Sequence, residues 1–177
     1  MRNAWGCMRR WGVGLFALAA GSGGIFFPVS DSQVWGLAVR PGVSSTAPDF
    51  QLAALENSER TTTLSEVYKD HRVLLIFWAS WCPSCVEEID TLNAWQERYQ
   101  AQGLQILGIN VRERREDVLK FTKLHPIRYP VLMDTEGEVA SRYGVVGLPM
   151  SVLLAKGGKI LYDGFSLPAD IDTLLNE

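Results

Sequence analysis

The stretch Val73–Cys85 constrains the fold of this 177-residue chain more than any other part of the sequence. Its first six residues, V-L-L-I-F-W, form an unbroken apolar run rich in branched and aromatic side chains, which is typical of a strand covered on both faces. From Pro83 onward, apolar residues recur at helical spacing with charged residues between them, and Gly103 closes the segment. These patterns predict a central strand that leads through a short loop into a long amphipathic helix.

The rest of the chain alternates between strand and helix patterns in the same way. Further strands are expected at residues 50–54, 60–63, 104–111, 131–133, 151–155 and 159–162, and helices at 64–68, 114–124, 136–143 and 167–175. Gly157 and Gly158 are typical of the turn of a terminal hairpin. This order of elements indicates an α/β fold with a mixed central sheet flanked by helices.

Residues 1–29 have the pattern of a membrane anchor or a signal segment. Three arginines and no acid precede Trp11–Val29, which contains no charged residue. As a helix, these 19 residues would extend about 28 Å, close to the hydrocarbon thickness of a bilayer. Cleavage as a signal peptide is the alternative, with Gly36-Leu37-Ala38 as a passable cleavage site. In both cases the arginines should stay in the cytoplasm, which places the later residues in the periplasm or on the extracytoplasmic face of the inner membrane.

Residues 30–46 are rich in Ser, Gly and Pro and lack a hydrophobic period, so we expect a linker there. Residues 47–177 are then predicted as one domain, because a chain with 47% hydrophobic residues can bury one sizeable core. The net charge of −3 and the dispersed lysines and arginines offer no basic surface for nucleic acid. We expect a monomer that needs no cofactor and binds no nucleic acid.

The chemistry of this domain is concentrated in Cys82 and Cys85. Cys7 lies on the other side of the apolar segment, so it cannot pair with them. A disulfide that closes so short a loop removes little entropy from the unfolded chain, which makes a purely structural bridge a weak explanation. A zinc site needs more ligands, and His71 and His125 do not stand at ligand spacing. A redox-active pair is the interpretation that remains.

The helix that begins at Pro83 sets the roles of the two cysteines. Cys82 is expected at its first turn, where the helix dipole and the unsatisfied backbone N–H groups favour a thiolate. In such positions the pKa of a cysteine falls from ~8.5 into the range of about 3.5 to 7.5. Pro83 suits this turn because its missing N–H would have no partner there. Cys82 is therefore the predicted nucleophile, and Cys85, on the same helix face, is the residue that resolves a mixed disulfide.

Four motifs, taken in order, resemble those of a known family. They are A47-P48-D49-F50, F77-W78-A79-S80-W81-C82-P83-S84-C85, D134-T135-E136-G137 and Y143-G144-V145-V146-G147-L148-P149. The C-x-x-C sequence and the later proline resemble the thioredoxin superfamily. The whole set resembles the TlpA-like group of membrane-anchored thiol:disulfide oxidoreductases, which includes reductases of the cytochrome c maturation type. The resemblance covers residues 47–177 and implies a thioredoxin-like fold.

The resemblance also implies roles for residues outside the cysteine pair. It implies a cis peptide bond between Leu148 and Pro149 that faces the cysteines and contacts the substrate; a proline also fits a strand start because it cannot donate a ladder hydrogen bond. Trp81 is expected to shield the pair and to shape the docking surface. Glu88 matches a family acid that moves protons near the resolving cysteine, and the alternative is a solvated helix charge like Glu87.

Two residues depart from the family pattern. Ile76 occupies the strand position at which thioredoxin itself carries a buried acid, so a proton relay would have to use Glu88 or water. Met150 follows Pro149 where relatives commonly have threonine, which leaves the detailed shape of the substrate groove open. Trp78, at the end of the predicted strand, is expected to pack in the core.

The predicted function is reduction of disulfides in partner proteins by exchange at Cys82-Pro83-Ser84-Cys85, with apocytochrome c as a candidate substrate. A membrane electron donor is then needed to reduce the pair again, because the compartment contains no thioredoxin. Three alternatives stay open: a disulfide-forming oxidase of the same fold, a peptide-binding or chaperone module, and a peroxidase. The peroxidase is the least favoured, because no basic residue lies near Cys82 in the sequence to hold a peroxide.

Overall fold

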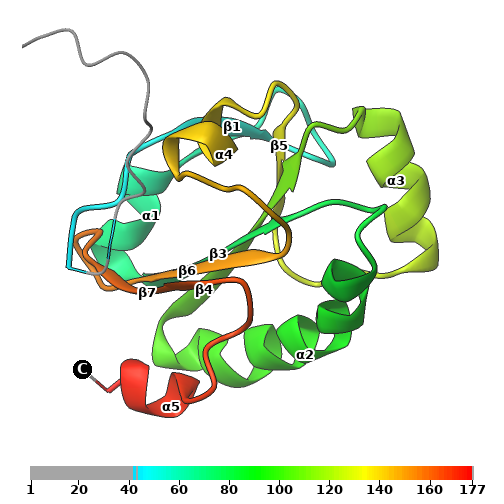
Figure 1. Ribbon diagram of the computed structural model, residues 1–177. Coiled ribbons are helices and arrows are strands. Elements are labelled where there is room, and N and C mark those ends of the chain that lie inside the picture. Colours follow the sequence, from blue (N-terminus) through cyan, green and yellow to red (C-terminus); the bar gives the residue numbers. More distant parts are fainter. Residues whose placement is uncertain (1–41, 43, 177) are drawn as a thin grey trace, which may run out of the picture. The chain divides into compact units, whose positions relative to one another are not determined.

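The computed structural model describes residues 42 and 44–176, which build a seven-stranded mixed sheet with helices on both faces (Figure 1). In chain order the elements are β1 (Gln51–Ala54), β2 (Thr61–Thr63), α1 (Leu64–Asp70), β3 (Arg72–Trp78), α2 (Pro83–Tyr99), the 3₁₀ turn η1 (Gln100–Gln102), β4 (Leu104–Val111), α3 (Arg115–Leu124), β5 (Val131–Asp134), α4 (Glu138–Arg142), β6 (Met150–Leu154), β7 (Ile160–Gly164) and α5 (Ile171–Leu174). The strand order is β2-β1-β5-β4-β3-β6-β7. The predicted α/β fold with a mixed sheet is confirmed.

β3 lies inside the sheet, as its apolar run predicts. It pairs in parallel with β4, with Arg72 opposite Leu104, and antiparallel with β6, with Phe77 opposite Met150. Val73–Trp78 is buried along its whole length. A strand covered on both faces can be apolar at every position, because neither row of side chains meets water. The loop that follows β3 therefore starts from a rigid support.

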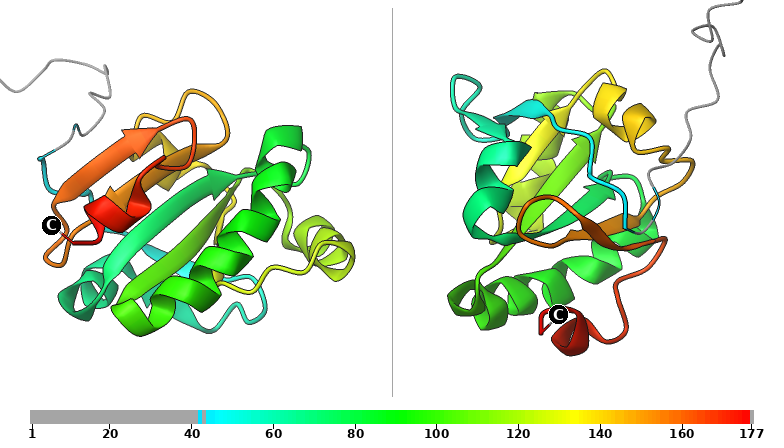
Figure 2. Two further views of the ribbon diagram at one scale, coloured as in Figure 1. Left: turned by 90° about the horizontal axis from the view of Figure 1, so that it is seen from below. Right: turned by 90° about the vertical axis from the view of Figure 1, so that its left-hand side faces the viewer.

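Two hydrophobic cores lie on opposite faces of the sheet. One contains side chains of α2, α3 and α5, among them Leu92, Val118 and Ile171. The other contains side chains of α1 and α4, among them Leu64 and Val139. The right-hand view in Figure 2 shows the green α2 and the red α5 together on one side of the strands. Because its apolar face is buried against the sheet, α2 is held with its first turn at the end of β3.

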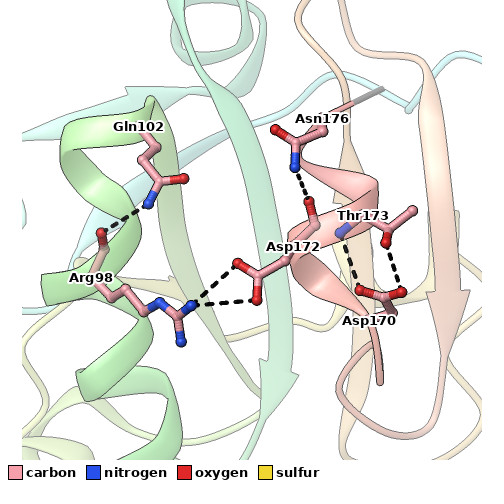
Figure 3. Close-up of polar contacts among 6 residues, drawn as sticks. All are labelled: Arg98, Gln102, Asp170, Asp172, Thr173 and Asn176. Atoms are coloured by element: carbon pink, nitrogen blue, oxygen red, sulfur yellow. Dashed lines mark hydrogen bonds and ion pairs between the residues drawn. The ribbon is translucent and has the colours of Figure 1, made fainter.

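The C-terminal helix is shorter than predicted. A helix was expected over residues 167–175, whereas α5 covers only Ile171–Leu174. Leu167 precedes a proline, which disfavours helical backbone at that residue. Asp170 then caps the helix, because its carboxylate accepts the N–H of Thr173 at 3.1 Å and the hydroxyl of Thr173 at 2.7 Å (Figure 3).

A surface ion pair joins α5 to α2. The guanidinium of Arg98, near the end of α2, lies 3.4 Å from the carboxylate of Asp172 (Figure 3). Both side chains are largely exposed, so this pair contributes little to stability. The apolar contacts of Ile171 and Leu175 with the core hold α5 in place instead.

The backbone before β1 also takes part in the fold. The N–H of Ser44 donates to the carbonyl of Ile160 at 2.8 Å, and Thr46 forms an isolated bridge with Lys159. These residues fall in the predicted linker 30–46, so its last part pairs with β7. The predicted anchor or signal segment, residues 1–29, lies outside the described residues. Within residues 42 and 44–176, none of the helices has the length and apolar character that crossing a membrane requires.

Candidate active site

The chain passes from β3 to α2 through the loop Ala79–Cys82. Cys82 is the N-cap residue of α2: its backbone is extended, and its Sγ accepts a hydrogen bond from the N–H of Cys85 at 3.3 Å. The N–H of Cys82 donates to the carbonyl of Ala79 at 3.2 Å. An N-cap acceptor satisfies one of the N–H groups that the first turn leaves without a partner inside the helix. The expected place of Cys82 at the start of the helix is confirmed.

Cys82 and Cys85 are joined by a disulfide, with their Cα atoms 5.3 Å apart. Their side chains are 5% and 3% exposed, so the bridge lies at the edge of the core. After reduction, a thiolate at Cys82 would accept the same N–H of Cys85, and a hydrogen bond to an ionised acceptor is stronger than one to a neutral acceptor. The local geometry therefore favours the ionised form of Cys82 in the dithiol state.

Strand register brings a distant loop to the cysteine pair. β6 begins at Met150, opposite Phe77 of β3, so Pro149 precedes β6 beside the point at which β3 leads into the cysteine loop. The peptide bond between Leu148 and Pro149 is cis, as the resemblance implies. Pro149 is buried and Leu148 is half-buried. Leu148 and Trp81 line the same pocket, so the two loops meet at the surface.

The two tryptophans at the end of β3 have different environments. Trp78 is 2% exposed, and its ring centroid lies 5.7 Å from that of Phe121 in α3, so its expected place in the core is confirmed. Trp81 is 69% exposed although it is adjacent to the buried Cys82. A large apolar side chain exposed to water next to the Cys82–Cys85 disulfide in the chain is suited to contact with a partner protein.

The two departures from the family pattern both lie in the core. Ile76 is buried in the middle of β3, so this position supplies no acid to the cysteine pair. Met150 is also buried and belongs to the core that contains α1 and α4. Because the side chain of Met150 packs in the core, the half-buried Leu148 shapes the surface here, and Met150 acts only through packing.

Glu88 lies three residues after Cys85 in α2, so the two side chains share one face of the helix. Oε2 of Glu88 is buried and has no hydrogen-bond partner in the described part of the chain. Burial raises the pKa of Glu88 above its usual value. Burial and, secondly, the charge of Glu88 raise the pKa of the Tyr129 hydroxyl, so the carboxylate faces the interior near this ring. A desolvated carboxyl beside a thiol is chemically able to exchange a proton with it.

Glu113, in the loop between β4 and α3, was not singled out by the sequence. Its carboxylate accepts three hydrogen bonds: from the backbone N–H of Ser80 at 2.7 Å, from the hydroxyl of Ser80, and from Nδ2 of Asn110 at 2.7 Å. Asn110 is fully buried at the end of β4. Glu113 therefore ties the cysteine loop, two residues before Cys82, to the neighbouring strand.

No signal in the sequence pointed to this contact. Glu113 lies in the charged run R112-E113-R114-R115-E116-D117, which is typical of a solvated helix start. Only the parallel pairing of β3 with β4, which sets Trp78 opposite Asn110, brings the loops after the two strands together. Elsewhere in residues 42 and 44–176, no three potential metal-ligating side chains gather into a site that could hold a metal ion.

A model of the AhpC/TSA family matches residues 43–163, more than half of the chain. The chain belongs to the AhpC/TSA family. Among curated proteins, thiol-disulfide oxidoreductase ResA of Geobacillus thermodenitrificans is 39% identical over 118 residues, which are 67% of this chain and 66% of that protein. ResA of Bacillus subtilis is 32% identical over 117 residues, which are 66% of this chain and 64% of that protein. The match thus spans just under two thirds of the length of these relatives.

Solved structures of similar proteins show the same fold. A crystal structure from Chlorobium tepidum, assigned to a thiol:disulfide interchange protein DsbE, is 34% identical and superimposes with a TM-score of 0.66 over 76% of this chain and 94% of that chain. The expected thioredoxin-like fold is therefore confirmed. Relatives named thiol-disulfide oxidoreductase, together with the thioredoxin-like family, support the prediction of a protein-disulfide oxidoreductase and agree with a TlpA-like reductase.

Proposed function

We propose that this protein reduces disulfides in partner proteins by dithiol–disulfide exchange on the extracytoplasmic side of a membrane. The observation that carries the exchange chemistry is the place of Cys82 at the N-cap of α2, with its Sγ accepting the N–H of Cys85, and the direction of reduction rests on the buried carboxyl of Glu88 on the same helix. This position stabilises a thiolate, which is the form of a cysteine that attacks a disulfide. The apolar surface of Trp81 beside Cys82 supplies a contact for the partner.

The exchange proceeds in two steps. The Cys82 thiolate attacks one sulfur of the partner's disulfide, so a new S–S bond forms while the other sulfur of the partner leaves as a thiolate and takes up a proton. Cys85 then loses its proton and attacks the Cys82 sulfur, which forms the Cys82–Cys85 disulfide and releases the second thiol of the partner. The partner gains two electrons from the cysteine pair and two protons, one that Cys82 released when it ionised and one from Cys85.

Glu88 is the group proposed to handle the proton of Cys85. It follows Cys85 by one helical turn, and its buried, unpaired Oε2 and raised pKa leave it able to accept a proton from the thiol and return it later. An ionised Glu88 also destabilises a thiolate on the same helix face, because the two negative charges repel each other. Since a stabilised thiolate makes a stronger oxidant, such repulsion favours a more reducing couple. This second effect supports the direction of reduction, whereas proton transfer by Glu88 serves exchange in either direction.

The substrate chain is proposed to lie across Trp81, Leu148 and Pro149. These residues come from the two loops that meet beside Cys82, and the substrate is held there while its cysteine is bonded to Cys82. The haem-attachment cysteines of apocytochrome c are the proposed substrate class. The proposed anchor in residues 1–29 would keep the domain 47–177 near a membrane dithiol donor, which returns two electrons to the oxidised pair.

The direction of the reaction is tested by the equilibrium potential of the Cys82–Cys85 couple in the purified protein. A potential near that of thioredoxin, about −270 mV, is expected for a reductase, whereas about −120 mV would indicate a disulfide-forming oxidase. A parallel assay with Cys82→Ser separates an enzyme from a peptide-binding module. The enzyme loses all reduction of an insulin disulfide, whereas a module that only binds peptides keeps its binding and shows no reduction in either form.

A further inference from the structure

A pocket of about 300 Å³ lies between Trp81, the residue before Cys82, and the loop before Pro149. Most of its lining residues are apolar or small: Trp81, Val111, Gly137, Ala140, Val145, Val146, Gly147 and Leu148. Trp81 and Val146 are 69% and 86% exposed, so the rim of the pocket presents large apolar side chains to solvent. Such surface beside a reaction centre is typical of a protein-binding site.

Arg112 is the only charged residue among the described residues that line this pocket. It directly follows β4, and its φ of 56° lies in the left-handed region that residues other than glycine rarely adopt. Its N–H donates to the carbonyl of Asp134 at 3.0 Å, which holds this backbone conformation. The unusual conformation sends the side chain across the surface and into the pocket wall.

The side chain of Arg112 is supported along its length but lacks a counter-ion. A Cβ atom at Gly137 would stand 2.9 Å from Cγ of Arg112, so only glycine leaves room for the arginine to lie flat against this turn. In the described part of the chain, no carboxylate forms an ion pair with Arg112. The neighbouring carboxylate of Glu113 is occupied by Ser80 and Asn110. The exposed side chain thus lies against the turn at Gly137 with its charge available.

We infer that this pocket selects partner polypeptides that carry an apolar residue and an acidic residue close to the reacting cysteine. The inference rests on the proposed function, because the partner is attached to Cys82 when it reaches the pocket. Trp81 lines the pocket and directly precedes Cys82, and Leu148 lines it one residue before Pro149, so a chain bonded to Cys82 reaches the pocket within a few residues of its cysteine. The apolar wall receives the apolar side chain, and Arg112 pairs with the acid.

The test compares two synthetic peptides that react with the reduced full-length protein. Each contains one intramolecular disulfide with a leucine next to one cysteine, followed by aspartate in one peptide and lysine in the other. The second-order rate constant of exchange is measured by quenching with an alkylating reagent and separating the products. The aspartate peptide is expected to react about fivefold faster at low salt, because an exposed ion pair has an effect of this size. The ratio should approach one at 1 M salt.

Two matched variants assign the preference to the pocket. Arg112→Gln should abolish the ratio between the two peptides. Arg114→Gln removes the same charge two residues away, outside the pocket lining, and should keep the ratio. Equal rates of the two peptides with the unmodified protein would overturn the inference and leave the proposed function intact. A preference that Arg114→Gln removes as fully as Arg112→Gln would also overturn it, because net charge would then be the cause. Failure of both peptides to react would contradict the proposed function as well.

Discussion

Glu113 accepts hydrogen bonds from both the backbone N–H and the hydroxyl of Ser80, although 33 residues separate the two in the chain. The same carboxylate accepts Nδ2 of the buried Asn110. The loop that carries Cys82 is therefore held from two sides, by β3 behind it and by the end of β4 beside it. A loop with fixed backbone keeps the sulfur at the start of α2, which is the position that its proposed reactivity requires.

Removal of this carboxylate should weaken both the fold and the chemistry. In Glu113→Ala, three donors lose their partner, and we expect a loss of about 2 kcal/mol in the free energy of unfolding, because donors of the buried Asn110 and the half-buried Ser80 are left unsatisfied. The exchange rate at Cys82 should also fall, since the loop is no longer tied to β4. Urea unfolding and the rate of alkylation of the reduced protein measure the two effects. The control Glu116→Ala, at the exposed start of α3, should stay within about 0.5 kcal/mol. Equal losses in the two variants would show that the contact with Ser80 contributes nothing.

Replacement of each cysteine in turn should give different products in the reaction with a disulfide-containing partner. In Cys85→Ser, Cys82 can still attack a partner, but no thiol remains to resolve the product, so a mixed disulfide should accumulate. In Cys82→Ser, the buried Cys85 has no N-cap position to stabilise its thiolate, and no adduct is expected. Mass spectrometry after reaction with a disulfide-containing peptide distinguishes the two. Adducts confined to Cys82→Ser would reverse the assignment of nucleophile and resolving cysteine.

Glu88→Gln should stabilise the protein at neutral pH. Because burial raises the pKa of Glu88, the folded state binds its proton more tightly than the unfolded state, and stability falls as pH rises from the unfolded pKa through the folded pKa. Glutamine does not ionise, so the variant lacks this loss, and its Tm should exceed that of the unmodified protein at pH 7. Below about pH 4 the carboxyl is protonated in both states, so the difference in Tm between the two proteins should no longer change with pH. Glu87→Gln, on the exposed side of the same turn, is the matched control and should show neither change. A lower Tm for Glu88→Gln at pH 7 would contradict a desolvated carboxylate.

The same variant also tests the proposed catalytic role of Glu88. If the carboxyl moves the proton of Cys85, the pH profile of the exchange rate should lose one ionisation in Glu88→Gln. An unchanged profile with a changed Tm would make Glu88 a structural residue only.

The turn between β6 and β7 offers a stability test far from the cysteine pair. Gly157 and Gly158 both have left-handed backbone, with φ of 84° and 82°. A Cβ atom at Gly157 would meet nothing within 4 Å, whereas one at Gly158 would stand 2.7 Å from Cε1 of Tyr68 in α1. We expect Gly157→Ala to cost about 1 kcal/mol for backbone strain alone, and Gly158→Ala to cost about 1–3 kcal/mol more for the clash.

Chemical denaturation of both variants checks this difference, and the exchange rate at Cys82 should be unchanged in each. If the two variants have the same free energy of unfolding, the ring of Tyr68 moves away from the added methyl group without loss of stability. The contact between Tyr68 and this turn would then contribute nothing to stability.

Local patterns in the sequence were sufficient for the elements that carry the chemistry. The apolar run of β3 and the helical period after Pro83 predicted a strand, a loop and a helix start, and these put Cys82 at the first turn of the helix without knowledge of any distant contact. This worked because burial on both faces and helix capping depend on residues within a few positions of one another. The cis peptide at Pro149 needed the family resemblance as well, since nothing local to Leu148 requires it.

Short helices at the end of the chain were less predictable. The apolar spacing of residues 167–175 suited a longer helix than α5, which starts only after Asp170 captures the N–H of Thr173. The length of such a short helix depends on its packing against α2, which the spacing of apolar residues does not predict.

By itself, the sequence determined the kind of chemistry: a pair of cysteines at a helix start, behind a buried strand, in a thioredoxin-like chain. Only the tertiary structure decided which other groups reach that pair. Glu113 meets Ser80, and Arg112 enters the pocket beside Trp81, because the parallel register of β3 and β4 sets the ends of both strands side by side. Glu113 and Arg112 belong to a run of charged residues that is typical of solvated surface. The spacing of charges along the chain does not indicate which distant residues folding brings close to them.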